Sequence, residues 1–257
     1  MKIAILGAGH MGSWLVDRLS ADHSVAVCDI NKTRVTKLSN VLKLKSYSDF
    51  KNFQPELFIN AVSLQNTIRA FESCLPYLPA DCIISDVASV KGSIPDFYRK
   101  TPFRFVSVHP MFGPTFANVD KLSDENVIII TESDEQGKLF FRNMFSTLGL
   151  SIYEYSFDEH DRMIAYSLTL PFASTMVFAA CMDNTTVPGS TFKKHLEISR
   201  GLMSEDDFLL SEILFNKYSL PELEKVTSRL DFLKHVIRAR DLEEAAKFFD
   251  RLRNNIK

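Results

Sequence analysis

A glycine motif directly follows the first apolar segment of the chain and places strict limits on its fold. Residues 2–6 (KIAIL) are strand-like, and Gly7, Gly9 and Gly12 follow them in the spacing G-x-G-x-x-G. The first glycine of this motif permits a tight turn, the second lets backbone N–H groups approach a pyrophosphate, and the third lets a helix pack closely on the strand. The motif therefore predicts a β-α-β unit that binds a dinucleotide, in preference to an ordinary strand-to-helix turn.

The rest of the first half alternates short apolar runs with longer amphipathic ones. Near-continuous apolar strands separated by helices are typical of a parallel sheet that is covered on both faces. The pattern predicts an α/β fold, with a Rossmann-type, mostly parallel sheet. Strands are expected at 2–6, 24–28, 57–62, 82–87, 103–108, 126–131 and 152–155, and helices at 11–20, 32–42, 66–75, 90–99 and 135–148.

The hydrophobic period changes after residue 158. From there on, apolar side chains recur every three to four positions, which indicates helices. We therefore predict a dinucleotide-binding Rossmann domain at 1–156 and an all-helical substrate and dimerisation domain at 157–257, within the one or two domains that 257 residues allow. The helices are expected at 160–182, 191–202, 205–216, 221–239 and 242–256.

Composition and charge argue against several other classes of protein. The net charge is -2, from 30 basic and 32 acidic residues, so no basic excess points to nucleic acid. No uninterrupted apolar run reaches the roughly 18 residues of a membrane span, and the N-terminus lacks the features of a signal peptide. The four cysteines show no C-x-x-C spacing, which favours reduced thiols and a cytoplasmic location. We expect no bound metal.

Asp29 is the candidate for choosing the dinucleotide. It ends the second strand about 20 residues after the first glycine, where an acidic side chain accepts hydrogen bonds from the adenosine ribose. A carboxylate repels a 2′-phosphate, so NAD is predicted, with NADP as the alternative because Lys32 and Arg34 lie close by. Asp29 could instead cap the next helix, a role also open to Asn31. The residues expected to bind the cofactor are Gly7, Gly9, His10, Met11, Gly12, Asp29, Ala61 and Val62.

Two later strand ends carry side chains capable of chemistry, Ser89 and His109. A hydride acceptor beside an imidazole suits the oxidation of an alcohol, because the histidine takes the hydroxyl proton while hydride leaves the carbon. Ser89 could instead cap the helix expected at 90–99. The other five histidines are interpreted as surface or structural residues, and Lys91 as a solvated charge.

Taken together, these motifs resemble the prephenate dehydrogenase family, which includes the arogenate dehydrogenases of tyrosine biosynthesis. The resemblance rests on G-A-G-H-M-G at 7–12, D-V-A-S-V-K at 86–91 and H-P-M-F-G-P-T at 109–115, followed by a helical second half. It implies oxidative decarboxylation of prephenate to 4-hydroxyphenylpyruvate, with His109 accepting the hydroxyl proton as hydride passes to NAD. It further implies that Ser89 aligns the hydroxyl or the imidazole, that Thr115 contacts the substrate, and that the chain is a homodimer.

The helical half departs from the family pattern around the substrate pocket. The family's S-H-L-P-H string is replaced by SLTLPF at 167–172, so the polar contact of its histidines must come from Thr169 or from elsewhere. The family's carboxylate-binding arginine aligns one position from Arg200. We expect Arg200 to bind a substrate carboxylate, with Lys193 as a second cation on the same helical face. The alternative is a surface ladder of Lys193, Glu197 and Arg200.

Several interpretations of the function stay open at this point. The first is prephenate dehydrogenase, with arogenate dehydrogenase as its near alternative. Another is a different Rossmann enzyme such as a pyrroline-carboxylate reductase, against which the string at 109–115 argues. A third is a non-catalytic dinucleotide-binding sensor, against which Ser89 and His109 argue. The apolar stretch 164–181 and the stripe from Leu223 to Ile237 favour a homodimer over a compact monomer.

Overall fold

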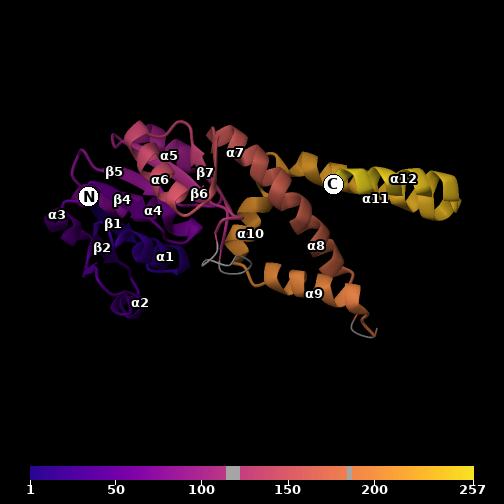
Figure 1. Ribbon diagram of the computed structural model, residues 1–257, viewed down its shortest axis with the longest axis horizontal. Helices are drawn as coiled ribbons and strands as arrows, with labels where there is room; N and C mark the ends of the chain where they lie inside the picture. The colour runs from indigo at the N-terminus through magenta and orange to yellow at the C-terminus, as the bar shows by residue number, and fades with distance from the viewer. Residues whose placement is uncertain (114–121, 184–186) are drawn as a thin grey trace.

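The computed structural model describes residues 1–113, 122–183 and 187–257, and its first half is a single eight-stranded sheet (Figure 1). The spatial order is β3-β2-β1-β4-β5-β6-β7-β8, and every pair is parallel except β6 with β7. The order 3-2-1-4-5-6 is that of a doubly wound dinucleotide-binding sheet. The predicted fold is confirmed. The strands are β1 Lys2–Leu6, β2 Ser24–Cys28, β3 Leu42–Lys43, β4 Leu57–Asn60, β5 Ile83–Asp86, β6 Phe105–Pro110, β7 Asn126–Ile130 and β8 Ser151–Tyr155.

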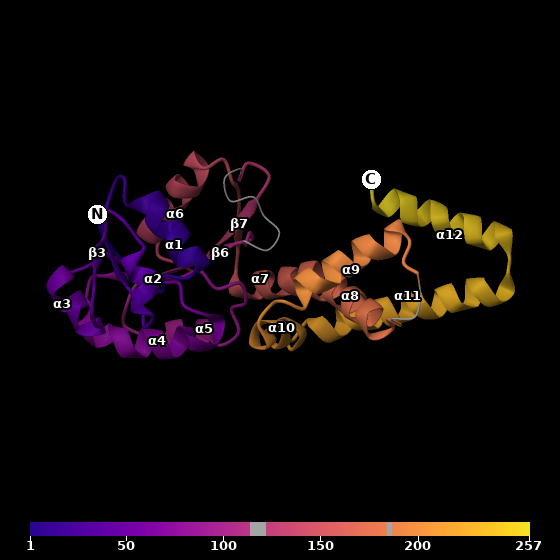
Figure 2. The same ribbon diagram turned by 90° about the horizontal axis from the view of Figure 1, so that it is seen from below.

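Helices cover both faces of the sheet, each over its own apolar core (Figure 2). Side chains alternate along a strand, so β1 sends Ile3 and Ile5 to one core and Ala4 and Leu6 to the other. Burial of both strand faces explains why these strands are apolar at nearly every position. On the first face lie α1 His10–Leu19 and α6 Glu135–Thr147, and on the second lie α3 Phe50–Phe53, α4 Thr67–Cys74 and α5 Ile94–Lys100.

Two predicted helices are shorter than expected. The helix expected at 32–42 is α2, Lys32–Thr36, since the chain turns through Asn40 in the left-handed region (φ 59°) to enter β3. The helix expected at 90–99 begins only at Ile94, after a turn at Gly92 (φ 38°). Ser89 therefore does not cap this helix, and that alternative is wrong.

The second half is helical, as predicted, and extends away from the sheet domain (Figures 1 and 2). The first helix begins at Phe157, because Ser156 and Glu159 form a capping box at its start. It continues without a break through a π-helical turn, Ala165–Thr169, into the next helix. The helices are α7 Phe157–Ile164, α8 Leu170–Ala180, α9 Ser190–Leu202, α10 Asp207–Leu214, α11 Ser219–Ala239 and α12 Leu242–Asn255.

The continuous helix Phe157–Ala180 is long and apolar enough, by length and composition, to cross a membrane, and 22% of its most apolar window is buried. The helix contains polar residues, so it is not the uninterrupted apolar run that the sequence lacks. A helix enclosed by other helices has the same all-round apolar character. The helix Phe157–Ala180 packs against α9 and α11, but part of its apolar surface stays exposed in the single chain.

Candidate active site

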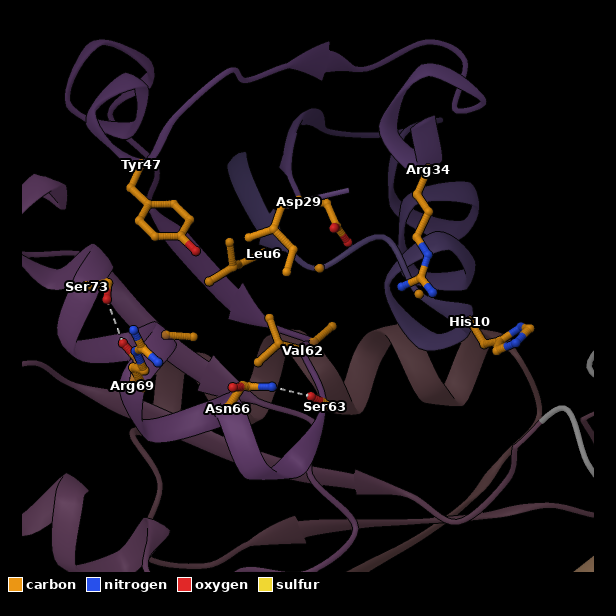
Figure 3. A pocket seen from close by; sticks show the side chains of 15 residues that line it. Leu6, His10, Asp29, Arg34, Tyr47, Val62, Ser63, Asn66, Arg69 and Ser73 are labelled. Carbon is orange, nitrogen blue, oxygen red and sulfur yellow. Dashed lines mark hydrogen bonds between the residues drawn. The ribbon is translucent and has the colours of Figure 1, made fainter. Parts of the chain in front are cut away.

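A cavity of about 660 Å³ lies at the carboxyl ends of β1, β2 and β4 (Figure 3). The strand order reverses between β1 and β4, and ligands of open α/β sheets bind at such a point. Six of the eight predicted cofactor residues line this cavity: Gly7, Gly9, His10, Asp29, Ala61 and Val62. Gly12 lies behind the turn, and Met11 packs against the core beneath α1 without lining the cavity.

The glycine turn requires glycine at its first and last positions. Gly7 has φ 99°, and a Cβ there would lie 2.7 Å from the carbonyl oxygen of Ala61. A Cβ on Gly12 would lie 1.9 Å from the carbonyl oxygen of Gly7, whereas one on Gly9 would meet open space. This close packing presents the N-terminus of α1 to the cavity, with N–H groups and dipole suited to a pyrophosphate. The residues present therefore fit a dinucleotide.

Asp29 has a structural role in addition to the predicted one. Its Oδ2 accepts a hydrogen bond from Ala8 N at 2.6 Å, and its Oδ1 accepts one from Asn31 N at 2.6 Å. Asn31, and not Asp29, caps α2, because its side chain accepts from Thr33 N. The carboxylate thus braces the glycine turn and still lines the cavity, where Arg34 and Arg69 also lie (Figure 3).

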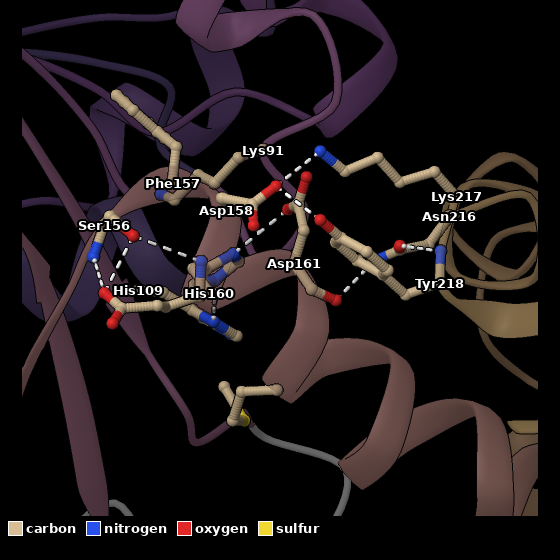
Figure 4. Close-up of polar contacts among 12 residues, drawn as sticks. Lys91, His109, Ser156, Phe157, Asp158, His160, Asp161, Asn216, Lys217 and Tyr218 are labelled. Atoms are coloured by element: carbon tan, nitrogen blue, oxygen red, sulfur yellow. Dashed lines mark hydrogen bonds and ion pairs between the residues drawn. The ribbon is translucent and has the colours of Figure 1, made fainter. Parts of the chain in front are cut away.

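His109 lies at the end of β6, 5% exposed, and contacts a second histidine from the helical half. Its Nδ1 is 3.0 Å from Nε2 of His160, and Nδ1 of His160 is 3.3 Å from Oδ1 of Asp161 (Figure 4). His160 is fully buried. The sequence interpretation treated His160 like the other histidines and missed this contact. The only local signal is the capping box at Ser156, which places His160 in the first turns of α7.

The surroundings of His109 favour its neutral form. Burial lowers the pKa of the imidazole well below its ordinary value of 6.5, and His160 and Lys91 lower it further. A neutral imidazole can accept a proton at neutral pH. Its Nε2 makes no hydrogen bond to any residue within the described ranges. His109 therefore has the protonation state and the unengaged atom that a general base needs.

Lys91 is fully buried, so its interpretation as a solvated charge is wrong. Its Nζ donates to Oδ1 of Asp86 at 2.8 Å and to the carbonyl oxygen of Val108 at 2.9 Å. Tyr98 donates its hydroxyl to the other Asp86 oxygen at 2.8 Å. Buried charges are found paired in this way because an isolated one is very costly to desolvate. The network anchors the peptide that precedes His109.

Ser89 is half-buried and follows β5, which pairs in parallel with β6. In this pairing Asp86 of β5 lies opposite Ser107 of β6. Ser89 and His109 therefore leave adjacent strands at the same sheet edge. Trp14 of α1 packs edge-on against Phe112, with ring centroids 5.1 Å apart, so the segment after His109 lies beside the cofactor helix. Thr115 lies outside the described residues.

Among the described residues, neither of the predicted substrate cations is a hydrogen-bond partner of His109. Lys193 and Arg200 are exposed on α9, whose C-terminal end points toward the sheet domain (Figures 1 and 2). Among the ion pairs of the described residues, none joins Lys193, Glu197 and Arg200, so the surface ladder does not form. Thr169 is also not available to a substrate, because it is buried and bonded to Ser219 at 2.6 Å.

Comparisons with known proteins identify one family. Residues 17–150 match the family model described as "Prephenate dehydrogenase, nucleotide-binding domain". The T-protein of Enterobacter agglomerans is 23% identical over 154 residues, which are 56% of this chain and 40% of that protein. This chain therefore matches about two fifths of the length of that curated relative.

Solved structures resemble the fold over nearly the whole chain. The prephenate dehydrogenase of Aquifex aeolicus superposes with a TM-score of 0.83 at 20% identity, covering 98% of each chain. Its complex with hydroxyphenyl propionate and NAD⁺ gives 0.82 at 18% identity, covering 99% of this chain and 96% of that one. Synechocystis arogenate dehydrogenase gives 0.79 at 20% identity, covering 99% and 98%. At these identities the likeness concerns the fold.

Proposed function

The chain belongs to the prephenate dehydrogenase family, and we propose that it catalyses the NAD-dependent oxidative decarboxylation of prephenate, with arogenate as the alternative substrate. The observation that carries the proposal is the state of His109. Its nearly buried, neutral imidazole has an Nε2 that no described residue bonds, at the sheet edge that also forms the dinucleotide cavity. The contact between Trp14 and Phe112 supports a single site in which His109 and the cofactor meet.

In this proposal each residue has a defined task. Bound nicotinamide supplies the hydride acceptor. His109 Nε2 accepts the proton of the ring hydroxyl as the carbon–hydrogen bond of the same carbon breaks. The resulting ring ketone is linked through the ring double bonds to the carbon that bears the carboxylate. When carbon dioxide leaves, the electron pair of the broken carbon–carbon bond moves through the ring to the ketone oxygen, which takes a proton back from His109, and the ring becomes a phenol. Ser89 aligns the hydroxyl with His109, and Arg200 with Lys193 receives the substrate's carboxylate, since Arg can form two parallel hydrogen bonds.

NAD is the proposed cofactor because Asp29 lines the cavity with a fixed carboxylate. A 2′-phosphate beside it would suffer like-charge repulsion. Arg34 and Arg69, which line the same cavity, reduce this penalty, so NADP is the expected weaker alternative.

We also propose a homodimer formed through residues 157–257. The predicted stripe on α11 is largely uncovered in the single chain: Leu223, Leu230, Leu233 and Ile237 are all exposed. A contiguous apolar surface of this kind marks an interaction site, and the helix Phe157–Ala180 adds to it. Sedimentation equilibrium at micromolar concentration tests this proposal, and a single 29.2 kDa species would reject it. A cytoplasmic location stays a prediction.

The decisive experiment is steady-state turnover of prephenate and of arogenate, each with NAD and NADP. We expect His109→Asn to lower kcat by about 10²–10⁴-fold, because a general base contributes that much. The matched control is His235→Asn, at a side chain 62% exposed on α11, which should remain near wild type. Bound NAD without turnover of either substrate would support the sensor interpretation instead, and a near-wild-type kcat for His109→Asn would remove its role.

A further inference from the structure

His109, His160 and Asp161 form a line of three groups across the two halves of the chain (Figure 4). His109 comes from β6, and the other two come from α7, the first helix of the helical half. Their polar atoms are joined at 3.0 Å and 3.3 Å. The reaction proposed above uses only His109, so the purpose of the buried histidine behind it needs a separate explanation.

The hydrogen between the two rings is assigned by Asp161. A carboxylate only accepts hydrogen bonds, so Nδ1 of His160 must carry a hydrogen to bond to it. Burial lowers the pKa of His160, and a neutral imidazole carries a single hydrogen. Its Nε2 is therefore an acceptor, and Nδ1 of His109 must be the donor. The one hydrogen of neutral His109 then lies on Nδ1, which leaves a lone pair on Nε2.

We propose that His160, oriented by Asp161, is a positioning residue that holds His109 in the tautomer whose Nε2 is free to take the substrate proton. This inference rests on the proposed function, and it adds to it that the base is set by a residue of the helical half. When His109 accepts the proton on Nε2, its Nδ1–H bond to His160 spreads the positive charge toward the Asp161 carboxylate. A partner of this kind fixes both the orientation and the tautomer of an imidazole.

Other charged groups around the pair are consistent with this assignment. Lys91, from the turn after β5, opposes protonation of both rings, while Asp86 pairs with Lys91 and favours the protonated form of His160. Asp161 also favours that form. The positive charge that develops on the histidine pair during the reaction is therefore close to two carboxylates, those of Asp86 and Asp161, and to the Lys91 ammonium group. That ammonium group is itself hydrogen-bonded to Asp86.

The position of His160 depends on how α7 docks. The Asp161 carbonyl oxygen, which Asp161→Asn leaves in place, accepts a hydrogen bond from Asn216 at 2.8 Å (Figure 4). The nearby pair of Asp158 with Lys217 is exposed to solvent and contributes little to this docking. Asp158 points to the connection between α10 and α11, and not to the histidines. It therefore provides a matched control: a carboxylate on the same helix, three residues earlier, with no contact to His160.

The test reads the tautomer directly. Long-range ¹H–¹⁵N correlation spectra of the full chain labelled with ¹⁵N-histidine distinguish imidazoles protonated on Nδ1 from those protonated on Nε2. His109→Asn and His160→Gln assign the signals. We expect both histidines of the wild type to be neutral and protonated on Nδ1. In Asp161→Asn the amide can donate to Nδ1 of His160, so both rings should switch to the Nε2–H form, while Asp158→Asn should leave them unchanged.

Kinetics supply the second readout. Asp161→Asn should lower kcat by about 10²-fold or more, because the base is then blocked, with KM for NAD unchanged. Asp158→Asn should keep kcat within about twofold. His160→Gln, whose Oε1 can still accept the Nδ1–H of His109, should retain more activity than His160→Phe. This comparison tests the role of His160 even if Asp161→Asn does not fold.

The outcomes separate the two proposals. Absence of turnover with either substrate would overturn the proposed function, and the spectra would still decide the tautomer. Turnover with His109 protonated on Nε2 in the wild type, or with no switch in Asp161→Asn, would overturn the role of His160 alone. Equal kcat for the Gln and Phe variants would also overturn it.

Discussion

Replacing Lys91 with methionine tests whether the buried ion pair supports the sheet edge that carries His109. Methionine has a similar length and no charge, so the change removes the ammonium group with little loss of volume. Oδ1 of Asp86 would keep Ala88 N as a donor at 3.0 Å, and Oδ2 would keep the hydroxyl of Tyr98 at 2.8 Å. The carbonyl oxygen of Val108 would lose its Lys91 donor.

The expected magnitude follows from burial of both partners, each at 0% side-chain exposure. Removing one member of a buried pair leaves an uncompensated charge and lowers the free energy of unfolding by about 3–5 kcal/mol. That is a large part of the roughly 5–15 kcal/mol by which a domain is stable. Lys91→Met combined with Asp86→Asn removes the orphaned charge, so we expect the double variant to recover at least about half of the loss.

Urea unfolding followed by tryptophan fluorescence suits this test, because the single tryptophan, Trp14, is buried in the sheet domain. The control is Arg99→Met on α5, which breaks an ion pair with Asp96 at side chains 71% and 63% exposed. A surface pair of this kind contributes about 0–1 kcal/mol. A Lys91→Met variant as stable as the control, or a double variant no more stable than the single one, would refute the reasoning.

Four further substitutions test the cofactor and substrate sites. Gly12→Ala places a Cβ 1.9 Å from the Gly7 carbonyl oxygen, so it should lower stability by about 1–3 kcal/mol and weaken NAD binding in a fluorescence titration; unchanged binding would contradict the packing argument. Asp29→Ser should narrow the preference for NAD in the ratio of kcat/KM values, and equal wild-type efficiency with NADP would count against a selective Asp29. Arg200→Ala should raise KM for the substrate about 10–150-fold, from the loss of about 1.5–3 kcal/mol, with KM for NAD unchanged. If only Lys193→Ala has this effect, Lys193 is the carboxylate ligand, and if both are silent, neither is.

Local patterns were sufficient for the sheet and the cofactor turn. The strands could be predicted because burial on both faces makes them apolar at nearly every position, as in β1. The glycine turn could be predicted because steric exclusion at Gly7 and Gly12 admits no side chain. His109 could be located because the carboxyl ends of parallel strands share one edge. Each of these constraints acts between residues that are neighbours along the chain or along a strand.

The interior partners of His109 needed the assembled fold. His160 is 51 positions away in the chain and meets His109 only because α7 docks at the end of the sheet. Lys91 is bonded to Asp86 and to the peptide before His109, and it lies in the turn before the helix begins at Ile94. A lysine and a histidine have the same local preferences whether they are solvated or buried. Their chemistry here depends on desolvation and on partners distant in the chain, and those arise only when sheet and helices pack together.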